Sequence, residues 1–255
     1  MSTNNRTGRK RDYVGVLSSV FAIVIGLLVG FVILLICNPS QALPGFVTIL
    51  TGAFTHGLKG VGQVFYYATP IILTGLSVGF AFKTGLFNIG TPGQFIVGAF
   101  AAVYVGIMWT GLGRIQWAVA LLAAILGGAL WGMVPGVLKA CFNVNEVIAS
   151  IMMNYIGMYM VNWIVKSYKP LFNNLRNESR NVAATAQIPK MGMDKLFPES
   201  SVGGGILLAI AAVLIIWVIL NKTTFGYELK AVGFNRDASR YAGINEKRNI
   251  IMSMV

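Results

Sequence analysis

The sequence predicts an all-α fold in which several helices cross a membrane as a polytopic bundle. Hydrophobic residues make up 56% of the 255 residues and charged residues only 11%, whereas about a quarter of a soluble domain is charged. A soluble fold of this size would need more polar side chains to cover its surface. In addition, residues 14–37 and 115–138 contain no charged side chain, and each run is as long as the ~20 apolar residues that cross a bilayer as a helix.

Six apolar segments are predicted to span the membrane. They are Val14–Cys37, Val61–Phe82, Phe95–Trp109, Trp117–Leu138, Val147–Val165 and Gly203–Leu220. The chain turns apolar again at Ile250 and stops at Val255, which is too short for a further span. We therefore expect residues 1–255 to form a single transmembrane domain that is truncated at its C-terminus.

Basic residues predict the orientation of the spans. Arg6, Arg9, Lys10 and Arg11 precede the first span, and lysine and arginine favour the cytoplasmic side. We therefore expect a cytoplasmic N-terminus, with residues 166–202 outside and residues 221–249 inside. The net charge of +12 then reflects loops beside anionic lipid headgroups, so the expected partner is a lipid bilayer and not a nucleic acid.

Residues that perform catalysis or bind metals are scarce. His56 is the single histidine and is expected in a solvated loop, the predicted spans contain no Asp or Glu, and no G-x-x-x-x-G-K-[ST] phosphate-binding loop occurs. Cys37 and Cys141 end different spans near opposite membrane faces, so we expect no disulfide. Ion-coupled carriers usually need an intramembrane carboxylate. The sequence therefore predicts a protein that is not an enzyme, holds no metal or cofactor, and takes its energy from another subunit.

Glycines repeat at four-residue spacing within three of the spans. The repeats are Gly26/Gly30, Gly75/Gly79 and Gly128/Gly132/Gly136. Small residues at this spacing share one helix face and let helix backbones approach closely in lipid. We expect these faces to pack against other helices.

The segment Gly85–Gln94, between the second and third spans, has the sequence GLFNIGTPGQ. Its three glycines and its proline do not continue a regular helix, yet its other residues are largely apolar. One interpretation is a broken helix that enters the bilayer, with Asn88 and Gln94 facing a polar solute. The other is a tight interfacial turn that only packs.

The segment Gly226–Ile244 follows the sixth span. Asn235 is a suitable N-cap, Asp237 favours a first helical turn, and Gly243 suits the position after a helix end, which predicts a helix of about two turns. Arg236 and Arg240 would share one face of it. Such a helix could insert into a groove on a soluble partner, or it could be a solvated amphipathic linker.

Three motifs resemble one known family. Gly85–Gln94 is similar to the G-L-F-N-I-G-x-x-G-Q signature of permeases in ATP-binding-cassette importers, in the branch that handles simple sugars, nucleosides and branched-chain amino acids. Asn145–Asn154 resembles the N-E-V-I-x-x-x-M-x-N segment of that branch, and Gly233–Ile244 resembles its G-x-N-x-x-A-A-x-Y-x-G-I docking segment. Two departures are Thr91-Pro92, where the family usually has Ala-Glu, and Ser239 at the second alanine of the docking segment. The likeness is strongest to nucleoside permeases, with simple sugar permeases next.

The resemblance implies a type II importer permease fold, with the whole chain as one permease domain and residues 226–244 as its cytoplasmic docking segment. It implies a place in a bacterial cell membrane. As partners it implies two cytoplasmic ATPases, a second permease subunit, identical or homologous, and an external solute-binding lipoprotein. The residues expected to dock the ATPase are Gly233, Asn235, Arg236, Ala238, Arg240, Tyr241 and Gly243. Those expected to line the translocation pathway are Asn88, Gln94 and Asn154. The alternatives are a stand-alone ion-coupled carrier or channel, and a branched-chain amino acid permease of the same branch.

Overall fold

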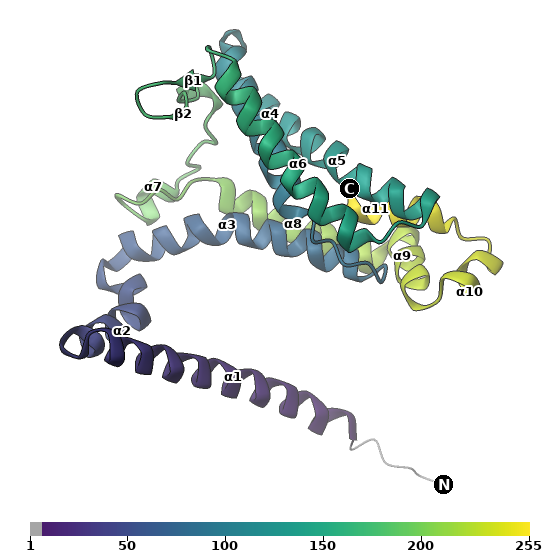
Figure 1. The fold of residues 1–255 in the computed structure, drawn as a ribbon, viewed down its shortest axis with the longest axis horizontal. Coiled ribbons are helices and arrows are strands. Elements are labelled where there is room, and N and C mark those ends of the chain that lie inside the picture. Colours follow the sequence, from purple (N-terminus) through teal and green to yellow (C-terminus); the bar gives the residue numbers. More distant parts are fainter. Residues whose placement is uncertain (1–6) are drawn as a thin grey trace. The chain divides into compact units, whose positions relative to one another are not determined.

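The computed structural model describes residues 7–255, and the side chains of residues 15–255. The basic side chains Arg6, Arg9, Lys10 and Arg11, on which the predicted orientation depends, lie outside the described side chains. The described chain is helical almost throughout, and its contacts divide it into two compact units, Met1–Val61 and Gly62–Val255. Figure 1 shows the order of the elements along the chain.

The first unit contains α1 (Thr7–Cys37) and α2 (Pro39–Thr55). Asn38 separates the two helices, which contact each other through the rings of Phe31 and Phe46, whose centroids are 4.8 Å apart. No helix was predicted for the stretch covered by α2, which lies between the first two predicted spans. Pro39 lies in the first turn of α2, where its missing N–H costs no hydrogen bond. Pro39 is therefore a suitable first residue for this helix.

Six helical segments of the described chain are long and apolar enough to cross a membrane, which confirms the six predicted spans. In the second unit the long helices are α3 (Gly57–Phe82, which begins in the first unit), α4 (Thr91–Met108), α5 (Gln116–Phe142), α6 (Glu146–Ser167) and α8 (Gly205–Lys222). The third span begins four residues earlier than predicted, because Pro92 lies in the first turn of α4 and is well suited to that position.

Helices α4, α5 and α6 pack closely against one another (Figure 1). Glycine allows the approach of α4 to α5, because a Cβ atom on Gly98 would lie 2.8 Å from the carbonyl oxygen of Ala124. Trp131 of α5 donates a hydrogen bond of 3.2 Å from Nε1 to the carbonyl oxygen of Met153 in α6. Of the three predicted glycine faces, only Gly128/Gly132/Gly136 packs within the described chain, against α4 and residues 251–254. No described atom lies within 4 Å of a Cβ built on Gly26, Gly30, Gly75 or Gly79.

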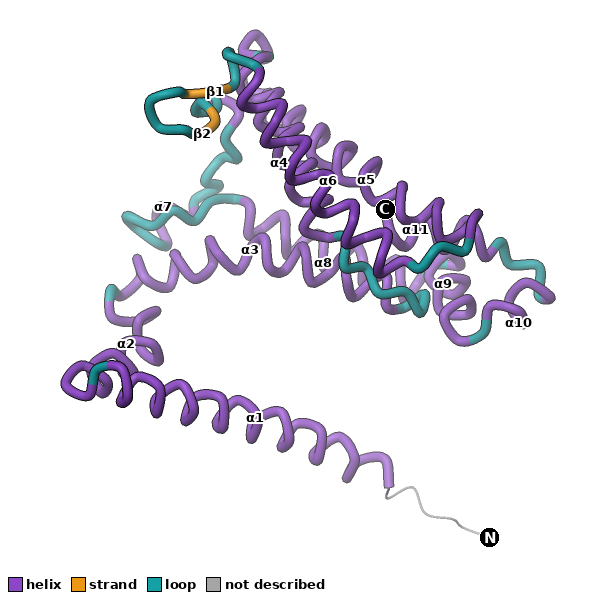
Figure 2. Tube along the Cα trace, in the orientation of Figure 1, coloured by secondary structure: helices purple, strands orange, loops and turns teal. Residues whose placement is uncertain are grey.

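Short elements connect the long helices. The 3-10 helix η1 (Thr110–Ile115) joins α4 to α5, and after α6 the chain forms β1 (Phe172–Asn173), β2 (Glu178–Ser179), the 3-10 helix η2 (Ala184–Ala186) and α7 (Met193–Leu196). The two strands pair antiparallel, with Phe172 opposite Ser179, and form a small hairpin (Figure 2). Gln116, which is fully buried, holds η2 against the ends of α4 and α5. Its amide donates to the carbonyl of Gly106 and accepts from the hydroxyl of Thr185.

Three helices complete the chain after α8. They are α9 (Thr224–Phe234), α10 (Arg236–Tyr241) and α11 (Glu246–Met254). The apolar segment predicted from Ile250 is the second half of α11. The helix begins four residues earlier, at Glu246, because the side-chain oxygen of Asn245 caps it. This oxygen accepts a hydrogen bond from the N–H of Arg248. Helix α11 packs against α5 and α9. The described C-terminus therefore lies inside the second unit, next to the loop between α3 and α4.

Candidate functional site: the loop 83–90 and the docking segment

The loop 83–90 joins α3 to α4 and is packed against the rest of the second unit. Leu86 and Asn88 are buried, with 0% and 1% of their surface exposed. Gly85 has a φ of +71°, a conformation that residues other than glycine rarely adopt. The side-chain oxygen of Asn88 accepts a 2.9 Å hydrogen bond from the N–H of Gly90, and its amide nitrogen donates to Oε1 of Gln94. The loop is thus held by its own amide side chain.

Asn154 of α6 binds the same loop from the side. Its amide nitrogen donates to the carbonyl oxygen of Ile89, and its oxygen accepts from the N–H of Gly93, each at 2.9 Å. The N–H of Gly93 lies in the first turn of α4, where no preceding carbonyl is available for it, and the N-cap residue Gly90 has no side chain to offer. Asn154 therefore caps α4 although it lies 61 positions further along the chain.

The three amides predicted to line a pathway thus lie together. The series of hydrogen bonds continues from Gln94, whose Nε2 donates a hydrogen bond of 2.6 Å to the carbonyl oxygen of Met254 in α11. Asn88, Gln94 and Asn154 link the loop to α4, α6 and α11 in one connected set of hydrogen bonds. These hydrogen bonds use much of the capacity of the three amides within the protein.

Two hollows adjoin this set. One, with a volume of about 570 Å³, lies among α3, α4, α5, α8 and α11 and includes Gln94 and Thr91 in its wall. The other, of about 750 Å³, lies along α3 and the loop and includes Asn88 and Phe95. Both walls are mainly apolar with a few hydroxyl and amide groups, which is typical of sites for small molecules. Asn154 lines neither hollow.

Residues 226–244, the predicted docking segment, contain the end of α9 and the short helix that the sequence predicts, α10. Asn235 is the N-cap of α10, and its side-chain oxygen accepts a 3.0 Å hydrogen bond from the N–H of Ala238. Gly243 follows the helix with a φ of +82°, as expected for glycine after a helix end. The helix ends at Tyr241, so the predicted boundaries are confirmed.

The other docking candidates differ in their surroundings. Ala238, Arg240 and Tyr241 are exposed, and Tyr241 has 94% of its surface exposed. Arg236 is half-buried and interacts electrostatically with Glu146 at the start of α6, whose carboxylate also forms a 2.9 Å ion pair with Lys139. Gly233 is exposed as well, but it lies in α9 and not in α10. Its backbone also contacts the backbone of the loop 83–90.

Two aromatic residues next to the predicted set escaped the sequence analysis. Phe234 and Tyr227 have 91% and 71% of their surface exposed, and together with Glu228, Ala238 and Ile244 they line an open groove of about 520 Å³ between α9 and α10. Their spacing of seven residues puts both on one face of α9, which is the signal that could have identified them. Exposed aromatic rings beside small side chains are typical of protein interfaces.

Comparison with known proteins identifies the family of this chain. The family described as "Branched-chain amino acid transport system / permease component" matches residues 60–255, which is more than half of the chain. The chain is 41% identical, over 92% of its length, to the guanosine ABC transporter permease protein NupP of Bacillus subtilis. It is 35% identical, over 99% of its length, to the nucleoside ABC transporter permease protein NupB of Lactococcus lactis. It is 32% identical, over 78% of its length, to the glucose ABC transporter permease protein TsgB13 of Haloferax volcanii.

The chain spans about two thirds of the length of the first two relatives, 66% and 68%, and 53% of the third. No solved structure matches it at a significant level. The family profile covers α4, α6 and the docking segment, and therefore includes all three motifs that the sequence analysis identified. This chain is a multi-pass membrane protein that belongs to the family of permease components of branched-chain amino acid transport systems.

Proposed function

We propose that this protein is the permease subunit of an ATP-binding-cassette importer that moves a nucleoside into a bacterial cell. A separate cytoplasmic ATPase drives the transport, a second permease subunit completes the pathway, and an external solute-binding lipoprotein delivers the solute. The observation that carries the proposal is the docking segment. The short capped helix exposes Ala238 and Tyr241 and adjoins an aromatic groove. Such a surface suits a contact in which the helix inserts into a groove on a soluble partner.

The choice of a nucleoside rests on the names of the relatives. The two that resemble the chain at 41% and 35% identity are named for guanosine and nucleosides, and the relative at 32% is named for glucose. Amide and hydroxyl groups in an otherwise apolar wall suit an uncharged solute with several hydrogen-bonding groups. Asn88 and Gln94, which line the two hollows, are the proposed polar contacts of the pathway, and Asn154 positions them.

Co-purification and uptake test the proposal. The full protein, expressed with its neighbouring subunits, is expected to co-purify with an ATPase and to import radiolabelled guanosine into proteoliposomes only when ATP and the solute-binding protein are present. Glucose and leucine serve as competing solutes. Import of guanosine by the permease alone, driven by an ion gradient, would instead identify a stand-alone carrier. Competition by glucose or leucine, but not by adenosine, would reassign the solute.

The proposed orientation has a direct test in the two natural cysteines. Cys37 ends α1 and Cys141 lies near the end of α5, and both are free and exposed. With a cytoplasmic N-terminus, a membrane-impermeant maleimide should label Cys37 in intact cells and Cys141 only after the cells are opened. The Cys37→Ser and Cys141→Ser variants separate the two signals. The reverse pattern would place the N-terminus and the docking segment outside and would contradict the proposed function.

A further inference from the structure

Two phenylalanine rings stack at the turn that ends α3. The N–H of Leu86 donates to the carbonyl of Ala81, and the N–H of Gly85 donates to the carbonyl of Phe82. With Gly85 at a φ of +71°, these two hydrogen bonds form the Schellman motif that commonly ends a helix. The turn brings Phe87 back to Phe82, and their rings stack with centroids 5.2 Å apart and planes 13° from parallel. We call Phe82 and Phe87 the stacked pair.

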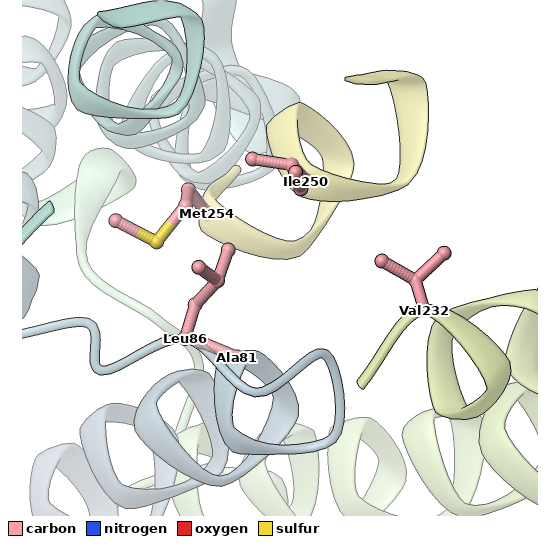
Figure 3. Close-up of a cluster of buried hydrophobic side chains, with 5 residues drawn as sticks. All are labelled: Ala81, Leu86, Val232, Ile250 and Met254. Atoms are coloured by element: carbon pink, nitrogen blue, oxygen red, sulfur yellow. The ribbon is translucent and has the colours of Figure 1, made fainter. Parts of the chain in front are cut away.

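A buried apolar cluster fixes this turn from one side. Figure 3 shows its members, which come from four elements: Ala81 of α3, Leu86 of the loop, Val232 of α9, and Ile250 and Met254 of α11. The rings of the stacked pair belong to the residues that directly follow Ala81 and Leu86, and both rings are exposed. Because the preceding residues are held in a densely packed interior, the stacked pair is pre-organised for a ligand.

The stacked pair lies in the wall of the hollow of about 750 Å³ along α3. Gly75 and Gly79 of the same helix line this hollow as well, and no described atom lies within 4 Å of a Cβ built on either glycine. The missing side chains leave room beside the rings, and Phe95 of α4 supplies a third ring. The hollow therefore combines a smooth stretch of helix backbone with aromatic faces.

The polar side chains in the wall of this hollow are Thr74, Asn88 and Thr91. The amide nitrogen of the buried Asn88 donates one hydrogen bond, to Gln94, so its second N–H has no partner among the described residues. The hydroxyls of Thr74 and Thr91 donate to backbone carbonyls and keep lone pairs that accept hydrogen bonds. The wall thus suits a ligand with a flat apolar face and a few polar groups at its edge.

We propose that this hollow is the base-binding subsite of the pathway, in which the planar base of a nucleoside stacks on Phe82 and Phe87. The inference rests on the proposed function, because the solute named there supplies the base. Aromatic side chains stack on any nucleobase, since every base has a π-face, whereas glucose has no aromatic ring. The stacked pair therefore separates nucleosides from simple sugars, and Asn88 donates its second N–H to an acceptor at the edge of the base.

Photolabelling of the wild-type complex tests the subsite without any substitution. The full protein, purified with its ATPase and its solute-binding protein, is irradiated with azidoguanosine, and the labelled peptides are identified by mass spectrometry. We expect label on the segment that forms the hollow, residues 71–95. Excess guanosine should remove this label, and excess glucose should leave it. If residues 71–95 carry no label that guanosine displaces, or if glucose displaces it equally, the inference is wrong.

Substitutions then separate stacking from packing. Phe82→Leu and Phe87→Leu keep an apolar side chain and remove a ring, and each should lower guanosine uptake about ten-fold, the loss that corresponds to one base–aromatic stack. Phe87→Trp keeps an aromatic face and should retain uptake within about two-fold of the wild type. Phe54→Leu is the matched control, because Phe54 is exposed on α2 and lies outside the hollow. The ATPase should co-purify with all four variants as it does with the wild type.

Filling the hollow gives an independent test. Gly75→Leu should reduce guanosine uptake while the second permease subunit stays bound, and Gly26→Leu on α1 is its control, since Gly26 also faces open space. Release of the second permease subunit by Gly75→Leu would make this face an interface between subunits and would contradict the inference.

The failure of the subsite is distinguishable from the failure of the proposed function. A wild-type complex that imports no nucleoside contradicts both. A wild-type complex that imports guanosine, and whose Phe82→Leu and Phe87→Leu variants import it equally well, contradicts the subsite alone and assigns the two rings to lipid contacts.

Discussion

Ala238→Glu in the full protein is expected to abolish nucleoside uptake by preventing the ATPase from binding. Ala238 is exposed on α10 and lines the groove formed with Tyr227 and Phe234. A glutamate there adds bulk and charge at the centre of the proposed contact, and changes at such central positions typically cost about 2 kcal/mol or more of binding free energy. We expect the amount of co-purified ATPase to fall by about 30-fold, with uptake reduced in parallel.

Two further variants make this result specific. Gly243→Lys adds bulk at the end of the same helix and forces a side chain into a φ of +82°, which costs about 1 kcal/mol of local stability. It should weaken ATPase binding in the same way. Ala184→Glu is the matched control: the substitution is identical, and Ala184 is exposed on η2 in the segment proposed to lie outside. If Ala238→Glu and Gly243→Lys retain both the ATPase and uptake, the docking segment is a solvated linker and the proposed function loses its main support.

Asn154→Leu is expected to lower the stability of the permease itself. Leucine is close to asparagine in size but leaves the N–H of Gly93 and the carbonyl of Ile89 without the partners that Asn154 supplies. Each lost buried hydrogen bond costs about 1 kcal/mol or more, and values for helix contacts in membranes lie at the low end. We therefore expect a loss of about 2 kcal/mol, measured by thermal or denaturant unfolding of the purified protein in detergent.

The controls for Asn154→Leu use the same helix and the same residue type. Asn162 is exposed on α6, so Asn162→Leu should leave the unfolding temperature unchanged. Asn154→Asp keeps the oxygen that accepts from Gly93 and loses the donor to Ile89, and it should have about half the effect. If Asn154→Leu is as stable as the wild type but imports guanosine more slowly, Asn154 contacts the solute and is not the cap of α4.

Local chemistry in the sequence was sufficient to predict the spans and the docking helix. A helix in a bilayer is specified by its own run of apolar residues, so the six spans could be counted without knowing their neighbours. Helix α10 could be predicted in the same way, because its N-cap is a hydrogen bond between residues three positions apart, Asn235 and Ala238. Asn235 and Gly243 fixed its two ends. Helix α2 was not predicted, although its start is local as well, because Pro39 is compatible with a first turn.

The tertiary structure alone decided what the motif residues do. Asn154 and Gly93 are 61 positions apart, and Gln94 and the carbonyl of Met254 are 160 apart. No periodicity in the sequence relates such positions. The rotation of each span about its axis is set by packing against the others, so the direction of an amide cannot be derived from its own helix. Composition thus determined that this chain crosses the membrane and that the stretch around Asn235 stays outside the spans. The packing of four separate elements determined that Gly233 of that stretch touches Gly85, since close contact between two backbones depends on the fold that brings them together.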